Sequence, residues 1–196
     1  RMIFVCAHGD LFHESVPDEW IDRVFAVMAL APQHTFQVLT KRAERMRDYV
    51  TGVIRSGRWL FWRHPTFGHE IFDAAVAQWD VMLRHVWLGV SVEDQRRADE
   101  RIPHLLDCPA AVRWVSYEPA LGTVNFEPGL TPRWKCNCTP GCRDGAEVSD
   151  SNGCPMCPRC GVKIGGEPRP GLDWIVVGGE SGAGARRFNV QWARDT

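Results

Sequence analysis

The chain has 196 residues, 44% of them hydrophobic and 24% charged, and its formal net charge at pH 7 is −1. These values are ordinary for a globular protein with one core, or with one core and a small module. The net charge excludes a positive electrostatic potential over the whole molecule, so nucleic acid would have to bind a local basic patch. The sequence shows neither a membrane-span-length apolar stretch nor a signal peptide, so we expect a cytoplasmic protein without membrane association.

Five short apolar runs alternate with helix-like segments along the chain. The runs are continuous rather than alternating, which is typical of parallel strands covered on both faces. They lie at residues 3–7, 34–40, 86–92, 111–117 and 173–178. Three of the nine tryptophans, Trp87, Trp114 and Trp174, fall in these runs, and we expect them to pack in the core.

The helical segments are indicated by apolar spacing and by capping residues. Ser15 and Asp18 have capping-box-like spacing, Pro17 suits a first helical turn, and Asn189 is a helix-cap residue. Gly, Pro and aromatic residues in 51–69 predict a loop insertion. Helices are predicted around Ile21–Met28, Lys41–Val50, Phe72–Leu83, Arg96–Leu106 and 190–194.

The predicted fold is α/β, with a partial parallel β/α barrel, because each unit outside two insertions has about the length of a βα repeat. We assign the barrel-like domain to residues 1–132 and 167–196, and a cysteine-rich insert to 133–166. An open doubly wound sheet is the alternative, although no glycine fingerprint for a dinucleotide follows the first strand. The first strand and the last helix lie close to the chain ends, so we expect further elements on both sides.

Each predicted strand ends in polar residues, and in β/α folds the carboxyl ends of the strands form one rim where active sites lie. Such carboxylates, facing basic side chains, can bind a zwitterionic cofactor, hold a metal or move protons. The candidate catalytic residues are Asp10, Lys41, Glu93, Glu118 and Glu180, and the candidate cofactor-binding residues are Arg42, Ser91, Gly178, Gly179 and Ser181.

Each rim residue also has an ordinary structural interpretation. Asp10 or Asp94 can be a helix N-cap, and Lys41 with Arg42 can be a solvated helix surface. The histidines His8, His13 and His34 lack metal-ligand spacing. Because all five strand ends are polar, we favour a functional rim.

Six of the eight cysteines fall between Cys136 and Cys160, and without a secretory signal such a cluster indicates metal binding before disulfides. Cys157 and Cys160 have zinc-knuckle spacing, and four thiolates complete a tetrahedral site. We therefore predict a zinc-ribbon-like insert with one structural zinc. Which four ligands hold it stays open among Cys136, Cys138, Cys142, Cys154, Cys157 and Cys160.

Basic and aromatic residues are interleaved between Lys41 and Arg63, where Trp59, Phe61 and Trp62 lie among arginines. Arginines with exposed aromatic rings can bind phosphate and stack bases. A charged helix face followed by an apolar lid is the alternative, and we favour it slightly.

Five motifs in order carry a resemblance that covers nearly the whole chain outside the two insertions. They are IFVCAHGDLFHESVP, HTFQVLTKRAERM, VWLGVSVEDQRRAD, RWVSYEPALG and DWIVVGGESGAGAR. Together they resemble a phage-associated family with a three-cysteine motif that looks like radical S-adenosylmethionine enzymes. The resemblance implies an incomplete β/α barrel, S-adenosylmethionine with a [4Fe–4S] cluster, and a partner protein named for the three-cysteine motif. The residues that match the family pattern are Asp10, Lys41, Arg42, Glu93, Asp94, Glu118, Glu180 and Ser181, and the resemblance assigns them no roles.

The chain departs from the family pattern in one respect, because it contains no three-cysteine cluster motif and begins after the place where that motif would lie. Three hypotheses follow. The first is a radical-S-adenosylmethionine-like enzyme of phage origin. The second is a non-catalytic zinc-binding adaptor for nucleic acid or a phage partner protein. The third is a metal-dependent hydrolase that uses the rim carboxylates.

Overall fold

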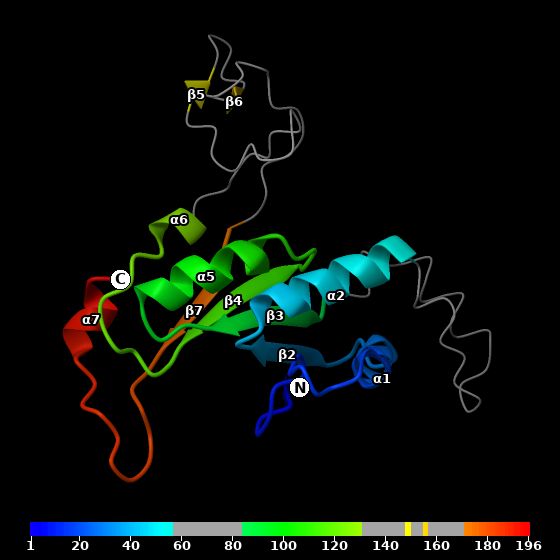
Figure 1. Ribbon diagram of the computed structural model, residues 1–196, viewed down its shortest axis with the longest axis horizontal. Coiled ribbons are helices and arrows are strands. Elements are labelled where there is room, and N and C mark those ends of the chain that lie inside the picture. Colours follow the sequence, from blue (N-terminus) through cyan, green and yellow to red (C-terminus); the bar gives the residue numbers. More distant parts are fainter. Residues whose placement is uncertain (57–83, 131–147, 150–154, 157–170) are drawn as a thin grey trace.

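The computed structural model describes residues 1–56, 84–130, 148–149, 155–156 and 171–196, and it describes 54–56 and the two dipeptides by their backbone only. Five strands form one parallel sheet in which the spatial order follows the chain order (Figure 1). The strands are β1 (Met2–Val5), β2 (Thr35–Thr40), β3 (Val86–Ser91), β4 (Val112–Tyr117) and β7 (Trp174–Val177). The sheet is open, with β1 and β7 at its edges.

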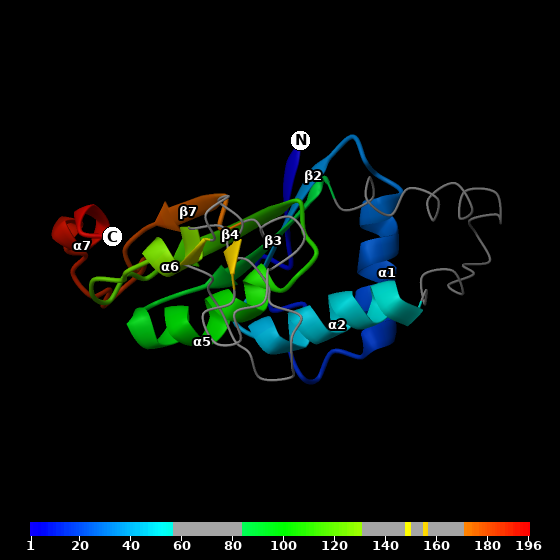
Figure 2. The same cartoon turned by 90° about the horizontal axis from the view of Figure 1, so that it is seen from above.

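Three long helices connect strands of this sheet: α1 (Asp18–Ala29), α2 (Ala43–Ser56) and α5 (Gln95–Leu106). Seen from above, α2 and α5 lie on one side of the strands (Figure 2). The other elements are short: α6 (Glu127–Leu130), α7 (Val190–Arg194), and the antiparallel pair β5 (Val148–Ser149) and β6 (Pro155–Met156). Among the described residues, no helix is long and apolar enough to cross a membrane.

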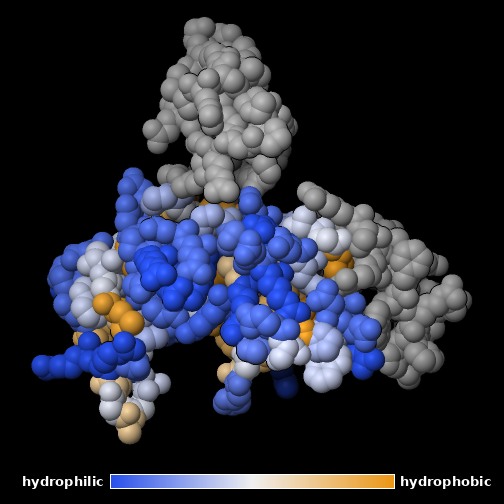
Figure 3. Space-filling model, viewed as in Figure 1, coloured by the Kyte–Doolittle hydropathy of each residue, from blue (hydrophilic) through white to orange (hydrophobic). Residues whose placement is uncertain are grey.

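The main core lies between the sheet and these helices. On the central strands β2, β3 and β4, the side chains that face the helices are almost fully buried, and most of them are apolar residues at every second position. They pack with the apolar faces of α1, α2 and α5 in one cluster, whose members include Val38, Leu88, Val115, Phe25, Met46 and Leu105. The helix-bearing side presents a mainly hydrophilic surface (Figure 3).

The opposite face of the sheet carries a separate aromatic cluster, here called the tryptophan face and made of Phe4, Trp87, Trp114 and Trp174. The rings of Trp114 and Trp174 lie 5.6 Å apart, those of Trp87 and Trp174 5.7 Å, and those of Phe4 and Trp114 6.2 Å. None of the four belongs to the main core cluster. The expectation that the strand tryptophans are buried in the core therefore holds for Trp114, which is 3% exposed, but not for Trp174, which is 38% exposed, and Trp87 is only partly buried.

The expected elements are found with shifted ends. Helix α2 runs to Ser56, so the part of the predicted loop insertion between residues 51 and 56 is helical; the rest, with the predicted helix at Phe72–Leu83, lies outside the described residues. Ser15 does not cap α1, because Pro17 is the N-cap residue in extended conformation, and Ser15 instead bonds to His13. Asn189 caps α7 as expected, by accepting a hydrogen bond from the Gln191 amide.

Gly89 supplies the space that Trp114 occupies on the tryptophan face. A Cβ on Gly89 would lie within 3 Å of the Trp114 indole, whereas a Cβ on Gly52 in α2 would meet nothing within 4 Å. We expect Gly89→Ala to lower the free energy of unfolding by about 1–3 kcal/mol through overpacking. Gly52→Ala is the matched control and should raise it by about 0.5–1 kcal/mol, because alanine suits a helix interior better. Urea unfolding measures both, and equal effects would contradict this packing.

Candidate functional site

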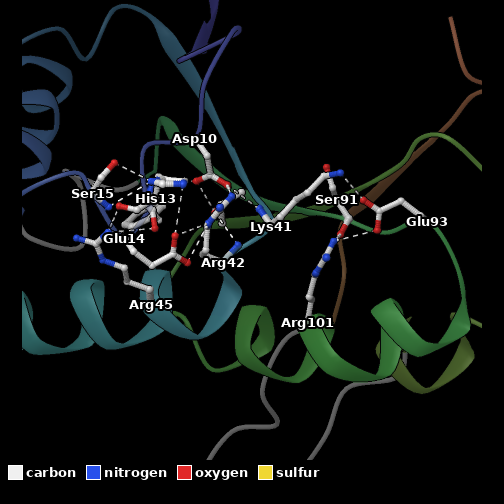
Figure 4. Close-up of polar contacts among 12 residues, drawn as sticks. Asp10, His13, Glu14, Ser15, Lys41, Arg42, Arg45, Ser91, Glu93 and Arg101 are labelled. Carbon is white, nitrogen blue, oxygen red and sulfur yellow. Dashed lines mark hydrogen bonds and ion pairs between the residues drawn. The ribbon is translucent and has the colours of Figure 1, made fainter.

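Asp10, in the loop after β1, ties the carboxyl ends of the first two strands together (Figure 4). Its Oδ1 accepts hydrogen bonds from the Phe12 amide at 2.9 Å and the Thr40 hydroxyl at 2.7 Å. Its Oδ2 accepts from the Lys41 amide at 3.0 Å and from Arg42 Nη1 at 3.1 Å. Burial alone would raise the pKa of Asp10, but these hydrogen bonds outweigh it and hold the pKa below its usual value.

The arginines beside Asp10 fix the loop that leads into α1. Arg42 also pairs with Glu14, through Nε and Oε1 at 3.2 Å. Arg45 donates to the backbone oxygens of Phe12, His13 and Val16 and pairs with Asp18. Both arginines therefore bind groups of the protein itself, and Arg42 stabilises the loop after β1.

A second charged group lies at the ends of β2 and β3, next to the first (Figure 4). Lys41 Nζ lies 2.6 Å from Glu93 Oε1, and Arg101 Nη1 lies 3.0 Å from Glu93 Oε2. The same Arg101 nitrogen donates to the Ser91 carbonyl at 2.7 Å. The side chains of Glu93 and Arg101 are 13% and 9% exposed, whereas that of Lys41 is 53% exposed. Lys41 is thus the exposed member of a charged group whose other two members are largely buried.

Sequence reasoning missed Arg101, which holds Glu93 in place from α5. Helix α5 contains several other charged residues, and the sequence does not show that Arg101 is the one whose side chain points toward the sheet. Asp94, in contrast, caps α5 by accepting from the Arg97 amide at 2.8 Å, which confirms its ordinary structural interpretation.

The end of β4 supplies an exposed carboxylate. Ser116, which is buried, donates its hydroxyl to Glu118 Oε2 at 2.9 Å, and Glu118 is exposed. A Cβ on Gly178 would overlap the Glu118 carboxyl group as it is placed, so a larger residue there would displace this carboxylate. Among the described residues, the ion pairs at the rim include Asp10, Glu14 and Glu93 but not Glu118.

Glu180 lies apart from the Lys41–Glu93 pair, in the loop after β7. Arg186 from the same loop binds it at two points, with Nε–Oε2 at 2.8 Å and Nη2–Oε1 at 3.0 Å. The Arg186 side-chain hydrogen bond is the main cause that lowers the Glu180 pKa to about 2. Gly179 approaches Phe188, and Ser181 is exposed. Within the described part, no hydrogen bond or ion pair joins Glu180 or Arg186 to Lys41 or Glu93.

The predicted zinc ligands cannot be placed, because Cys136, Cys138, Cys142, Cys154, Cys157 and Cys160 lie outside the described residues, as do Trp59, Phe61 and Trp62. Within the described ranges the free cysteines are Cys6, which is exposed, and Cys108, whose burial raises its pKa to about 12. The same ranges hold no group of three or more His, Cys, Asp or Glu that could bind a metal ion.

The pKa of Asp10 predicts how its contribution to stability depends on pH. A lowered folded-state pKa gives stability that is present above the unfolded value of 3.8 and is lost as the pH falls through the folded value. We expect Asp10→Asn to lower the free energy of unfolding by about 1–3 kcal/mol at pH 7, because it weakens charge-assisted hydrogen bonds. Denaturant unfolding at pH 7 and pH 3 should show the difference from wild type shrinking at pH 3. Glu19→Gln, at an exposed position of α1, is the control, and a cost for Asp10→Asn that is independent of pH would contradict the assignment.

The comparison with known proteins gives one match. No curated protein and no solved structure matches the chain. The match is to a family described as "Protein of unknown function (DUF5131)", and it covers residues 1–196. Because the match spans the whole sequence, the chain belongs to the DUF5131 family.

Proposed function

We propose that this protein is a β/α-barrel-type enzyme resembling radical S-adenosylmethionine enzymes, and that it binds a zwitterionic ligand at the carboxyl edge of its sheet. The observation that carries the proposal is the half-exposed Lys41 side chain, whose ammonium pairs with the partly buried Glu93 at that edge.

The barrel part of the proposal is supported by the order of the strands. A doubly wound sheet reverses its strand order at a switch point, where its ligand binds. Here the order β1-β2-β3-β4-β7 runs without a reversal, and the helices between the strands share one core. In a β/α barrel, each successive βα unit adds its strand at the same edge of the sheet.

The zwitterion part is supported by the charges that the rim leaves accessible. Lys41, directly after β2, offers a cation whose remaining N–H donors can hold a carboxylate, and Glu118, directly after β4, offers an anion that can hold an ammonium. The ends of β2 and β4 are separated by β3 and are therefore about 10 Å apart. Side chains of this length can converge over that distance on one small ligand.

A purely structural role explains the Lys41–Glu93–Arg101 group less well. Burying an ion pair costs desolvation that its attraction barely repays, so such pairs contribute little to net stability. The Glu93 carboxylate nevertheless lies between two cations, one of which extends into solvent. We interpret Arg101 as the residue that neutralises and orients Glu93, so that the Lys41 ammonium keeps donors for a ligand.

Two groups are implied by the family resemblance, and the described residues fit only one of them. S-adenosylmethionine fits, because Lys41 would hold its carboxylate, Glu118 its ammonium, and Gly178 would allow a close approach of the backbone. When bound, it would supply an activated sulfonium for transfer or cleavage chemistry. A three-thiolate cluster does not fit Cys6 and Cys108, so no step is assigned to an iron–sulfur centre.

The proposal predicts that Lys41→Met weakens binding of S-adenosylhomocysteine, a stable analogue with the same zwitterionic end. We expect about tenfold or more loss of affinity, because a charge-assisted hydrogen bond to the ligand carboxylate is removed. Arg96→Gln removes one positive charge from an exposed position of α5 and is the matched control. Isothermal titration calorimetry of the folded variants measures both.

Two outcomes would contradict the proposal. One is that the folded wild-type chain binds neither S-adenosylhomocysteine nor methionine at millimolar concentration. The other is that Lys41→Met and Arg96→Gln weaken binding equally, which would indicate a general effect of charge rather than a contact at the rim.

A second candidate function is a zinc-binding adaptor that contacts nucleic acid or a phage partner protein. It rests on the sequence spacing of Cys157 and Cys160 together with the four preceding cysteines. The backbone of β6 lies between Cys154 and Cys157 in the sequence and pairs with β5, so a short antiparallel ribbon accompanies the cysteines. A structural zinc in the insert is compatible with the enzyme proposal as well.

We expect one zinc per chain after purification without added metal. Thiolates must be deprotonated to bind zinc, so the affinity should fall as the pH is lowered. Elemental analysis gives the metal content, and Cys157→Ser with Cys160→Ser should abolish it, while Cys108→Ser outside the insert should not. Less than a tenth of an equivalent of zinc in folded wild-type protein would contradict the prediction.

A further inference from the structure

A histidine and an arginine join the two long helices that follow β2 and β3. His104 on α5 contacts Arg47 on α2, with Nδ1 of the imidazole 2.5 Å from Nη1 of the guanidinium. The two helices pack against each other on the same side of the sheet (Figure 2). Each of them begins directly after the charged end of a strand, so a change in their packing reaches the rim.

The chemistry of the two groups fixes the protonation state of His104 in this contact. A guanidinium donates hydrogen bonds and accepts none, so Nδ1 of His104 must be the acceptor. The imidazole is therefore neutral and carries its proton on Nε2. Protonation would turn Nδ1 into a donor and place two cations at hydrogen-bond distance, so the contact exists only with neutral His104.

Acidic residues of α2 hold Arg47 in place beside the imidazole. Its Nε and Nη2 lie 2.8 Å and 2.6 Å from Asp48 Oδ1, and Nη2 lies 3.4 Å from Glu44 Oε1. The Arg47 side chain is 25% exposed and His104 is partly buried, so solvent screens a repulsion between them only in part. A protonated His104 is therefore relieved most directly by movement of α5 away from α2.

The charges around His104 act on it in both directions. The titratable and charged groups near it come from α2, from α5 and from the turn after α5: Glu44, Arg47, Asp48, Glu100 and Cys108. Burial and Arg47 lower the pKa of His104, whereas the three carboxylates raise it, and the net result is a pKa below the usual 6.5. The carboxylates compensate poorly because they bind arginines, and the described ion pairs do not include His104.

The same two helices carry the charged group of the rim. Helix α2 begins two residues after Lys41, and Arg101 lies three residues before His104 on α5, where it binds Glu93. Residues three apart on a helix are neighbours on its surface. A movement of α5 away from α2 therefore draws Arg101 and Glu93 away from the Lys41 ammonium.

We propose that the Arg47–His104 contact is a pH switch, in which protonation of His104 loosens the packing of α5 on α2 and weakens ligand binding at the rim. The ligand part rests on the zwitterion site proposed above and adds its regulation, whereas the change in helix packing needs no ligand. Because the folded-state pKa is lowered, the stability contributed by neutral His104 is fully present above the unfolded value of 6.5 and is lost as the pH falls through the folded value.

Urea unfolding between pH 7.5 and pH 5 isolates the histidines, because carboxyl groups titrate mostly below this range. On acidification, the unfolding equilibrium constant of wild type should rise about threefold more than that of His104→Gln, whose amide oxygen can accept from Arg47 without titrating. Arg47→Met should also reduce the pH dependence, because the repulsion is removed. His8→Gln, at an exposed position after β1, is the control and should keep the wild-type dependence.

NMR follows the rim through the same titration. The amide signals of Lys41, Glu93 and Arg101 should shift with the midpoint of the His104 imidazole and stay constant in His104→Gln. The affinity of wild type for S-adenosylhomocysteine should fall about threefold or more over the same range, while that of His104→Gln should not.

Three outcomes would each overturn the inference. They are an imidazole midpoint of His104 at or above 6.5, equal pH dependence of unfolding for wild type and His104→Gln, and rim amides that do not follow His104. Failure of the zwitterion site is distinct, because S-adenosylhomocysteine would then bind at no pH while the rim amides still followed His104.

Discussion

The carboxylate of Asp10 is the contact on which the arrangement of the rim depends. It joins a loop after β1 to the turn between β2 and α2 by accepting from Thr40, Lys41 and Arg42. The bond to the Lys41 amide fixes the backbone where the chain leaves the sheet, and the Lys41 side chain extends from there to Glu93. The Asp10 carboxylate thus holds the turn that contains Lys41 close to β3.

Parallel pairing explains why residues far apart in the sequence meet at this edge. All five strands run in one direction, so every strand delivers its following residue to the same end of the sheet. Lys41 and Glu93 are thereby brought within 2.6 Å, and Glu118 lies one strand further along. These charged residues directly follow ordered strands. Their backbone positions are therefore set by the sheet itself.

The sequence was sufficient to predict the strands and much of the rim. Continuous apolar runs identified all five strands to within two residues, because each run is short, rich in β-branched and aromatic residues, and bounded by polar or turn-forming residues. The strand ends placed Lys41 and Glu93 at the same rim, but the ion pair between them came from the structure. Arg101 and the role of Gly178 also came from the structure, because they depend on which way a helix faces and on how closely β4 and β7 approach. The position of the tryptophans also needed the strand register, since a continuous apolar run does not reveal which face of the sheet a residue occupies.

The central claim is that a zwitterionic ligand binds at the carboxyl edge of the sheet, and mapping of backbone amide shifts by NMR during titration with S-adenosylhomocysteine tests it most directly. The account predicts that the largest shifts fall at residues 39–42, 91–94 and 116–119, where the strands end. Amides at the opposite ends of the same strands, near Thr35, Val86 and Val112, should move little. Shifts concentrated at that amino-terminal edge, or spread evenly over the surface helices, would contradict the account.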